Sequence, residues 1–212
     1  MGSDTSTAVV RCSLLHLGAA LLVFSGVAAC GGDDDPVGPG RDVHAFSFES
    51  GLGNWEPDAT DLDDPPISWE IDTTTRFADD GDRAVRLRLE NLNDAGKIWI
   101  ERRFDVEPET EYDIDLTFAF GTGDGGSINL WTVIAGAHGH DPETRTDLTF
   151  QGDTGHEQGL GSGIVWVDRS YGLTARSDAD GSLWVSIGVW GTYEVTRIYY
   201  VDDVQIRLEP RS

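Results

Sequence analysis

The stretch that decides the fold class is Ile198-Tyr199-Tyr200-Val201-Asp202-Asp203-Val204-Gln205-Ile206-Arg207-Leu208, close to the carboxyl end. Alternate residues of a β-strand share a face. With that period, one face holds Ile198, Tyr200, Asp202, Val204, Ile206 and Leu208, and the other holds Tyr199, Val201, Asp203, Gln205 and Arg207. The first face is apolar apart from one carboxylate, so it is the predicted core face. A terminal strand of this kind has to pair with folded chain, and its predicted neighbour is the segment Val43–Glu49.

Asp202 is the exception on this predicted core face. An unpaired carboxylate is costly to bury, because it loses its hydration without gaining a partner. The sequence therefore predicts a strong partner for Asp202, either a cation or several N–H donors.

Other apolar segments between residues 43 and 210 also alternate with period two, and clusters of Gly, Asp and Pro separate them. The predicted inward-facing sets are Tyr112, Ile114, Leu116, Phe118 and Phe120; Val85, Leu87 and Leu89; Ile128, Leu130, Thr132 and Ile134; and Leu183, Val185, Ile187 and Val189. No amphipathic helix of three turns is evident. About eight to ten strands, each with one polar face, predict an all-β, two-sheet antiparallel β-sandwich of the jelly-roll type.

The two ends of this region carry a resemblance to a known family. The sequence Tyr-Tyr-Val-Asp-Asp-Val at 199–204, together with Phe46-Ser-Phe-Glu-Ser-Gly-Leu-Gly-Asn-Trp55, resembles the galactose-binding-like jelly rolls of carbohydrate-binding modules. In that family the corresponding segments commonly flank a structural calcium ion. The resemblance therefore implies a calcium site formed by Glu49 and Asp202, with Asp203 as a further ligand.

The first thirty residues have the layout of a secretory signal. An apolar run, Leu14–Phe24, follows Arg11 and is too short to span a membrane as a mature helix. Val27-Ala28-Ala29-Cys30 then resembles the lipobox of bacterial lipoproteins, in which the Cys is lipid-modified and becomes the new N-terminus. The other interpretation is an ordinary signal peptide with an incidental Cys.

These features predict three parts of the chain. Residues 1–29 are the predicted lipoprotein signal peptide, 30–42 the lipidated Cys30 with a flexible acidic linker, and 43–210 the β-sandwich binding domain. The predicted location is secreted and anchored by lipid, in the cell envelope or at the cell surface. Several acyl chains on one residue would make this attachment firm.

Charge restricts the partners. The sequence has 38 acidic residues against 15 basic ones, a formal net charge of −23. Such a charge argues against nucleic acid, and against membrane contact other than through the lipid. It is compatible with calcium or with a neutral or cationic ligand. Cys12 and Cys30 both precede the predicted domain, which therefore has no internal disulfide.

Aromatic residues out of phase with the apolar faces suggest a ligand. Flat aromatic rings on polar strand faces stack against the C–H faces of sugars, and neighbouring polar groups then bind the hydroxyls. The predicted carbohydrate-binding residues are Trp99, Asn129, Trp131, Trp184, Trp190 and Tyr199. The other interpretation is that the long segment Gly136–Gly163 folds back and covers these rings.

Two further functions stay open beside non-catalytic binding of a polysaccharide or other glycan. The run Glu111-Tyr112-Asp113-Ile114-Asp115 resembles the Glu-x-Asp-x-x-Glu run of sandwich-fold β-glucanases, although it departs from that pattern at the third acid. With Glu101, these acids are the candidates for an extracytoplasmic glycoside hydrolase or lyase, but they also suit a solvated strand face. The second alternative is a structural or adhesion lipoprotein without a small ligand.

Overall fold

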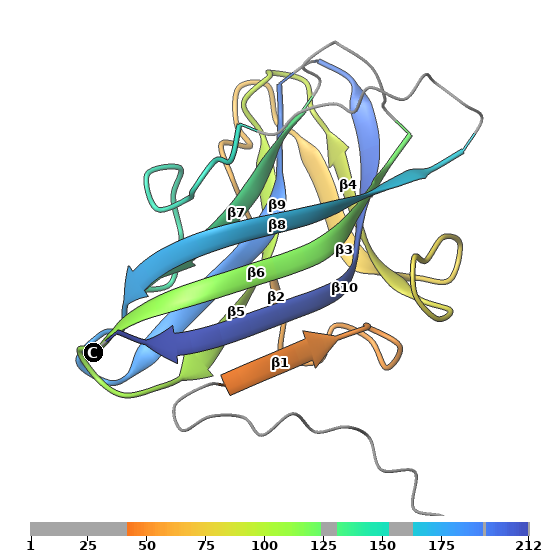
Figure 1. Ribbon diagram of the computed structural model, residues 1–212. Helices are drawn as coiled ribbons and strands as arrows, with labels where there is room; N and C mark the ends of the chain where they lie inside the picture. Colours follow the sequence, from red (N-terminus) through yellow and green to blue (C-terminus); the bar gives the residue numbers. More distant parts are fainter. Residues whose placement is uncertain (1–41, 124–130, 153–162, 193, 212) are drawn as a thin grey trace, which may run out of the picture. The chain divides into compact units, whose positions relative to one another are not determined.

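The computed structural model describes residues 42–123, 131–152, 163–192 and 194–211. These residues contain ten β-strands (Figure 1). These residues all belong to the unit Pro36–Ser212. The strands are β1 (Asp42–Phe46), β2 (Glu56–Thr60), β3 (Ser68–Thr74), β4 (Ala84–Glu90), β5 (Lys97–Asp105), β6 (Glu111–Thr122), β7 (Trp131–His138), β8 (Val165–Arg176), β9 (Ser182–Gly191) and β10 (Thr196–Pro210).

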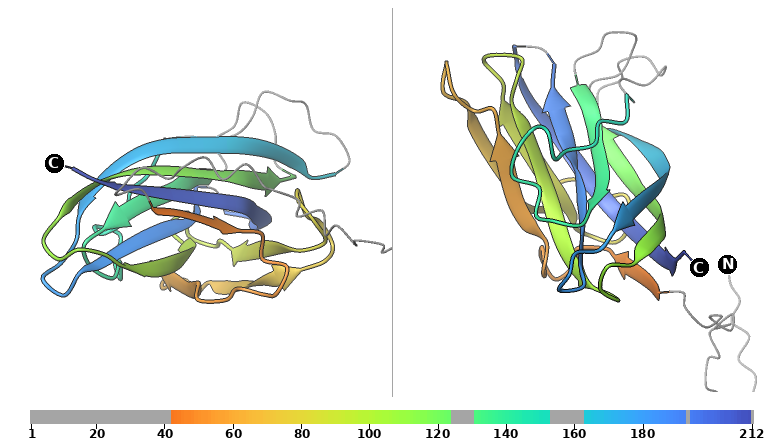
Figure 2. Two further views of the ribbon diagram at one scale, coloured as in Figure 1. Left: turned by 60° about the horizontal axis from the view of Figure 1, so that its bottom comes forward. Right: turned by 90° about the vertical axis from the view of Figure 1, so that its left-hand side faces the viewer.

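The strands form two antiparallel sheets that face each other as the layers of a sandwich (Figure 2). The larger sheet has the order β3-β4-β10-β6-β8, and β1 also pairs with β10. The smaller sheet has the order β2-β5-β9-β7. The predicted all-β sandwich is therefore confirmed. Among the residues that the structure describes, no helix has the length and hydropathy needed to span a bilayer.

The predicted pairing of the first and last strands is also confirmed. β1 lies antiparallel to the second half of β10, from Asp42 opposite Leu208 to Phe46 opposite Val204. The first half of β10 pairs with β4, and β6 runs along its other side. β10 thus organises the larger sheet, since three strands pair with it.

Three of the four predicted inward-facing sets lie in the core between the sheets. They are the sets on β4, β6 and β9: Val85, Leu87 and Leu89; Tyr112, Ile114, Leu116, Phe118 and Phe120; and Leu183, Val185, Ile187 and Val189. Burying this much apolar side-chain surface is the main force that holds the sheets together.

The predicted faces of β10 are wrong for its first half. Tyr199 and Val201 lie in the core, and so do Val204, Ile206 and Leu208, so the inward phase changes along the strand. The cause is a β-bulge, where the register with β6 shifts between Asp202 and Gln205 and Asp203 has a φ of 43°. A bulge inserts one extra residue and so exchanges the two faces beyond it.

The predicted inward set on β7 is also wrong. Trp131, Val133 and Ala135 point into the core, whereas Ile134 lies on the outer face in a separate cluster with Trp99 and Leu148. Both faces of β7 therefore carry buried apolar residues, since the segment with Leu148 covers Ile134 on the outer face. Alternation alone therefore did not identify the inner one. Ile128 and Leu130 lie outside the described residues.

Candidate functional site

Two of the predicted sugar-binding rings lie in the core between the sheets. Trp131 and Tyr199 have no exposed surface, and their rings meet edge to face with centroids 6.2 Å apart. Both also contact Phe120, at 5.0 Å and 5.9 Å between centroids. The prediction that they lie on an outer face is thus wrong, for the reasons of strand phase given above.

Trp99 is on the outer face of the smaller sheet, as predicted, but it is covered. Leu148 and Phe150 pack over it, next to Ile134. The covering segment, residues 148–151, is fixed along the edge strand β7, where the amide of Ala135 donates to the Thr149 carbonyl at 3.1 Å. For Trp99, the interpretation that the long segment after β7 covers the ring is therefore confirmed.

Trp190 and Trp184 also point outward from β9 and are partly buried. The Trp190 ring contacts Phe150 at 5.3 Å between centroids, and the Lys97 ammonium lies 4.9 Å from it. Its indole N–H donates to the Asp94 carbonyl at 2.9 Å. Trp184 lies opposite His138 of β7 and Arg103 of β5. Asn129 is outside the described residues.

A buried polar group lies beside Trp99 on this outer face. The Trp99 indole donates to the Glu101 carboxyl at 2.6 Å, and burial raises the Glu101 pKa to about 8 against the effect of that bond. The nearby carboxyl of Asp141 raises it further. Burial likewise lowers the His138 pKa to about 4, and His138 lies 3.2 Å from the Ser186 hydroxyl. Both groups are therefore mainly uncharged at neutral pH.

The acids of the hydrolase alternative do not converge. Glu101 lies on the outer face of the smaller sheet, whereas Glu111, Asp113 and Asp115 are exposed on β6 of the larger sheet. Arg211 pairs with Glu111 at 3.0 Å and with Asp113 at 3.1 Å. The three acids on β6 thus form a solvated strand face, which is the plainer of the two interpretations.

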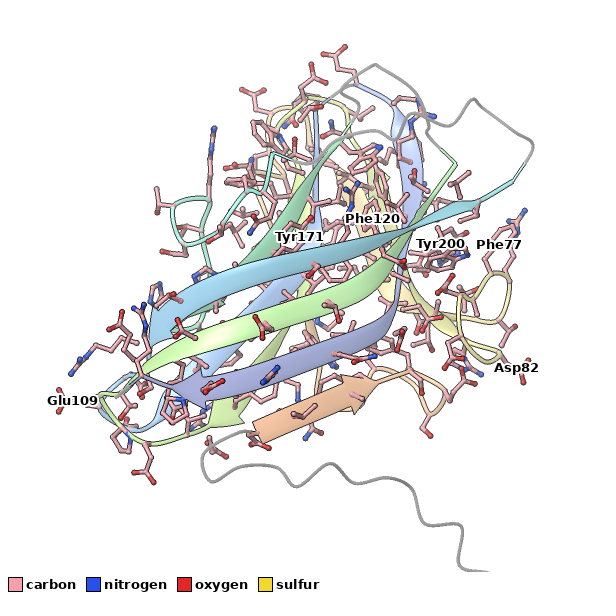
Figure 3. The ribbon with its side chains drawn as sticks, in the orientation of Figure 1. Phe77, Asp82, Glu109, Phe120, Tyr171 and Tyr200 are labelled. Atoms are coloured by element: carbon pink, nitrogen blue, oxygen red, sulfur yellow. The ribbon has the colours of Figure 1, made fainter. Side chains whose placement is uncertain are left out.

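Asp202 is fully buried, and its partners are N–H donors. Its carboxylate accepts hydrogen bonds from the amides of Asp79 at 2.9 Å, Asp80 at 3.1 Å and Asp203 at 2.9 Å. Glu49 accepts from two further amides of the same loop, those of Asp82 and Arg83, both at 3.0 Å. The two carboxylates therefore hold the loop between β3 and β4. Asp82, labelled in Figure 3, belongs to this loop.

The amide donors take up part of the acceptor capacity of the residues predicted to bind calcium. Both bonds to Glu49 go to Oε1, and Asp202 accepts two at Oδ2 and one at Oδ1. Glu49 and Asp202 bind different amides of the loop, and Asp203 is exposed. Within the described ranges, no group of three or more His, Cys, Asp or Glu side chains could hold a metal ion. The amide donors account for the burial of Asp202, and calcium at Glu49, Asp202 and Asp203 stays a prediction.

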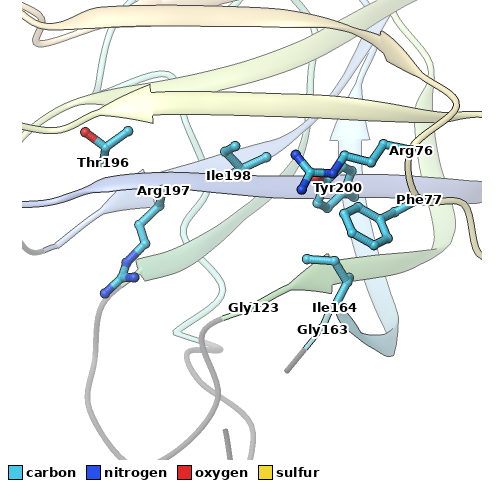
Figure 4. Close-up of a pocket in the computed structure, with 9 residues that line it drawn as sticks. All are labelled: Arg76, Phe77, Gly123, Gly163, Ile164, Thr196, Arg197, Ile198 and Tyr200. Atoms are coloured by element: carbon cyan, nitrogen blue, oxygen red, sulfur yellow. The ribbon is translucent and has the colours of Figure 1, made fainter. Parts of the chain in front are cut away.

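A hollow of about 400 Å³ lies on the outer face of the larger sheet, where β10 begins. Phe77 and Tyr200 lie side by side there, at the opposite end of the sandwich from Glu109 (Figure 3). Their rings meet edge to face at 5.5 Å between centroids. The lining residues are Arg76, Phe77, Gly123, Gly163, Ile164, Thr196, Arg197, Ile198 and Tyr200 (Figure 4).

Glycine in β6 makes room for a third ring beside this hollow. Gly121 lies between Tyr200 on β10 and Trp166 on β8 in the strand register. A Cβ at Gly121 would come within 2.9 Å of the Trp166 ring, so the indole lies directly over this residue. The Trp166 and Tyr200 rings are 6.1 Å apart between centroids.

The sequence contained a signal for this second group of rings. Trp166 alternates with Asp168 and Ser170, so it is an aromatic residue on a polar face. Tyr200 was assigned to the core face only because the bulge at Asp203 was not visible in the sequence. Phe77 stands in a loop, where strand periodicity gives no information about its direction.

The chain has similar solved structures but no matching sequence family. Neither a protein-family model nor a curated protein sequence matches the chain. Solved structures do: the CBM22-1 xylan-binding domain of Paenibacillus barcinonensis Xyn10C is 17% identical, with 82% of this chain and 98% of that one covered and a TM-score of 0.47. The K3 cleaved adhesin domain of Lys-gingipain from Porphyromonas gingivalis W83 is 14% identical, with 79% and 99% covered and a TM-score of 0.48. TmCBM61, solved with β-1,4-galactotriose, is 11% identical, with 76% and 92% covered and a TM-score of 0.44. The chain is thus similar in overall fold to carbohydrate-binding modules and to an adhesin domain.

Proposed function

We propose that this domain binds carbohydrate without catalysis, in the hollow beside Tyr200. The observation that carries the proposal is the grouping of aromatic rings and hydrogen-bond donors around one open space. Phe77 and Trp166 are partly exposed, while Tyr200 is buried between them. A sugar ring stacks its C–H face on such side chains, and groups such as the Arg76 guanidinium and the Thr196 hydroxyl bind its hydroxyls.

The same hollow disfavours the hydrolase alternative. Glycoside hydrolysis commonly needs two carboxyl groups on either side of the scissile bond. None of the described residues that line the hollow is acidic. Of the acids considered for catalysis, Glu101 belongs to the other sheet, and the β6 acids are exposed along the strand. Binding alone is the function that these side chains support.

The proposed setting is outside the cytoplasm, with the domain attached to a membrane by lipid on Cys30. The support is the lipobox-like sequence Val27-Ala28-Ala29-Cys30, which lies outside the described residues. Mass spectrometry of the membrane-extracted protein tests this part. We expect a mature N-terminus at a diacylated or triacylated Cys30. An unmodified Cys30 with the preceding residues still attached would contradict it.

A glycan-array screen of the purified protein, followed by calorimetry on the strongest ligand, tests the binding site. Phe77→Ala removes one wall of the hollow and should weaken binding at least tenfold. Trp184→Ala is the matched control, because Trp184 is a partly buried aromatic on the other sheet. Retained binding in Phe77→Ala with loss in Trp184→Ala would move the site to the smaller sheet. No binding to any glycan would favour the structural or adhesion alternative.

A further inference from the structure

The described lining of the hollow is basic, whereas the molecule is acidic. The chain has 38 acidic and 15 basic residues, yet the described residues that line the hollow include two arginines, Arg76 and Arg197, and no acid. Carboxylates do lie nearby, at Asp79 and Asp168, but neither lines the hollow. A local excess of positive charge on an acidic protein is suited to an anionic group on a ligand.

Arg76 is the arginine best placed to meet such a group. It is exposed, and its guanidinium lies 5.3 Å from the centre of the Phe77 ring. Figure 4 shows its side chain next to Tyr200 and Phe77 at one end of the hollow. Burial raises the Tyr200 pKa, and the positive charges of Arg76 and Arg86 oppose that rise.

Two arginines of the neighbouring strand β4 have ion-pair partners, unlike Arg76. Arg86 pairs with Glu70 at 2.8 Å, and Arg88 pairs with Glu90 at 3.4 Å. Arg76 forms no ion pair with any residue in the described part of the chain. Its guanidinium carries five N–H donors in a planar arrangement that matches a carboxylate.

We propose that the hollow selects an acidic glycan, with a uronic acid residue whose carboxylate is bound by Arg76 and whose ring stacks against Phe77. This inference rests on the proposed carbohydrate binding and adds the ligand class. A guanidinium–carboxylate pair adds a charge-assisted bidentate hydrogen bond to the stacking contact. Arg197, at the other end of the hollow, adds positive charge there (Figure 4).

A short oligosaccharide is the right probe, because the net charge of −23 repels a long polyanion as a whole. We would compare trigalacturonate with its fully methyl-esterified form by calorimetry. The two ligands share their sugar rings and differ in charge. We expect the acid form to bind at least tenfold more tightly. Arg76→Gln should abolish that difference between the acid and the ester.

Arg207→Gln is the matched control. Arg207 is an arginine of the same sheet, on the second half of β10, and lies 3.8 Å from Asp115. Its replacement should leave both affinities unchanged. Equal affinity for acid and ester, or an undiminished preference in Arg76→Gln, overturns the acidic-glycan inference. If neutral glycans still bind in a Phe77-dependent way, the proposed function stands without it. If no glycan binds, the proposed function itself fails.

Discussion

The Trp99 indole N–H donates a hydrogen bond to the Glu101 carboxyl, with 2.6 Å between Nε1 and Oε2. The pair lies on the outer face of the smaller sheet, and Glu101 has only 5% of its surface exposed. Burial raises the Glu101 pKa to about 8, and the negative charges of Asp141 and Asp58 act in the same direction. The hydrogen bond from Trp99 favours the charged form, but it does not compensate for the lost hydration.

The raised pKa makes stability depend on pH. The Glu101 pKa is about 8 in the folded chain against 4.5 ordinarily, so between these values the folded state holds a proton that the unfolded state has lost. The free energy of unfolding should therefore fall as pH rises from about 4.5 to about 8. Glu101→Gln keeps an oxygen that can accept from Trp99 and cannot ionise.

We expect Glu101→Gln to be more stable than the parent protein at pH 8, by one to a few kcal/mol, since each pKa unit is worth about 1.4 kcal/mol. At pH 4.5 the two proteins should be nearly equal. Urea unfolding across this pH range measures the difference. Glu111→Gln, at an exposed acid of β6, is the control for the loss of one carboxyl group. A constant gap between Glu101→Gln and the parent protein would contradict the assignment.

The second prediction concerns the core tryptophan. Trp131 has no exposed surface and packs against Phe120 and Tyr199, so Trp131→Ala leaves a large cavity. The free energy of unfolding should fall by about 3–5 kcal/mol. Leu92→Ala, at a site with 45% of its surface exposed, should change it by no more than about 0.5 kcal/mol. Denaturant unfolding distinguishes the two, and a surface-like effect at Trp131 would revive the platform prediction.

The third prediction tests the arrangement of Trp166. Gly121→Ala places a methyl group 2.9 Å from the Trp166 ring, so the indole has to shift from its position beside Tyr200. Near-ultraviolet circular dichroism should change, and glycan binding in the hollow should weaken by about tenfold or more. Gly172→Ala on β8 is the control, because a Cβ there meets nothing within 4 Å. Unchanged spectra in Gly121→Ala would show that Trp166 does not lie over this glycine.

The fourth prediction concerns the buried carboxylate. In Asp202→Asn, one of the two oxygens becomes an NH₂ group that faces N–H donors of Asp79, Asp80 or Asp203. An unsatisfied buried group costs about 1–3 kcal/mol, so the protein should be destabilised by about that amount. The amides that lose their acceptor, among those of Asp79, Asp80 and Asp203, should exchange hydrogen faster, which NMR measures directly. Unaltered exchange at all three amides would show that Asp202 does not hold the loop.

The fifth prediction addresses calcium, which the family resemblance implies at Glu49, Asp202 and Asp203. If an ion binds there, it stabilises the folded state by mass action, and excess chelator lowers the melting temperature. If the amide donors alone hold these carboxylates, the melting curve is the same in chelator and in millimolar calcium. Because the resemblance implies an ion at these residues, we expect the melting temperature to fall in chelator, and an unchanged curve with no ion retained would count against the site. A fall in melting temperature in chelator would establish the ion.

The sequence could predict the sheets because it shows which strands alternate. On β4, β6 and β9 one face is uniformly apolar and the other is mixed or polar, so the period of two identifies the buried side. The pairing of β1 with β10 followed from the need of a terminal strand for a folded neighbour. The site could not be predicted in the same way. Phe77 comes from a loop and Trp166 from β8, and Tyr200 lies on β10 before the bulge that exchanges its faces.

The sequence by itself determined the all-β class, the two-sheet sandwich and the need of Asp202 for strong partners. Only the tertiary structure decided which rings are available to a ligand. One extra residue at Asp203 turned Tyr199 inward and Tyr200 outward, and the segment 148–151 covered Trp99. The physical reason is that alternation reports which residues share a face, whereas exposure depends on bulges and on distant chain that packs over that face.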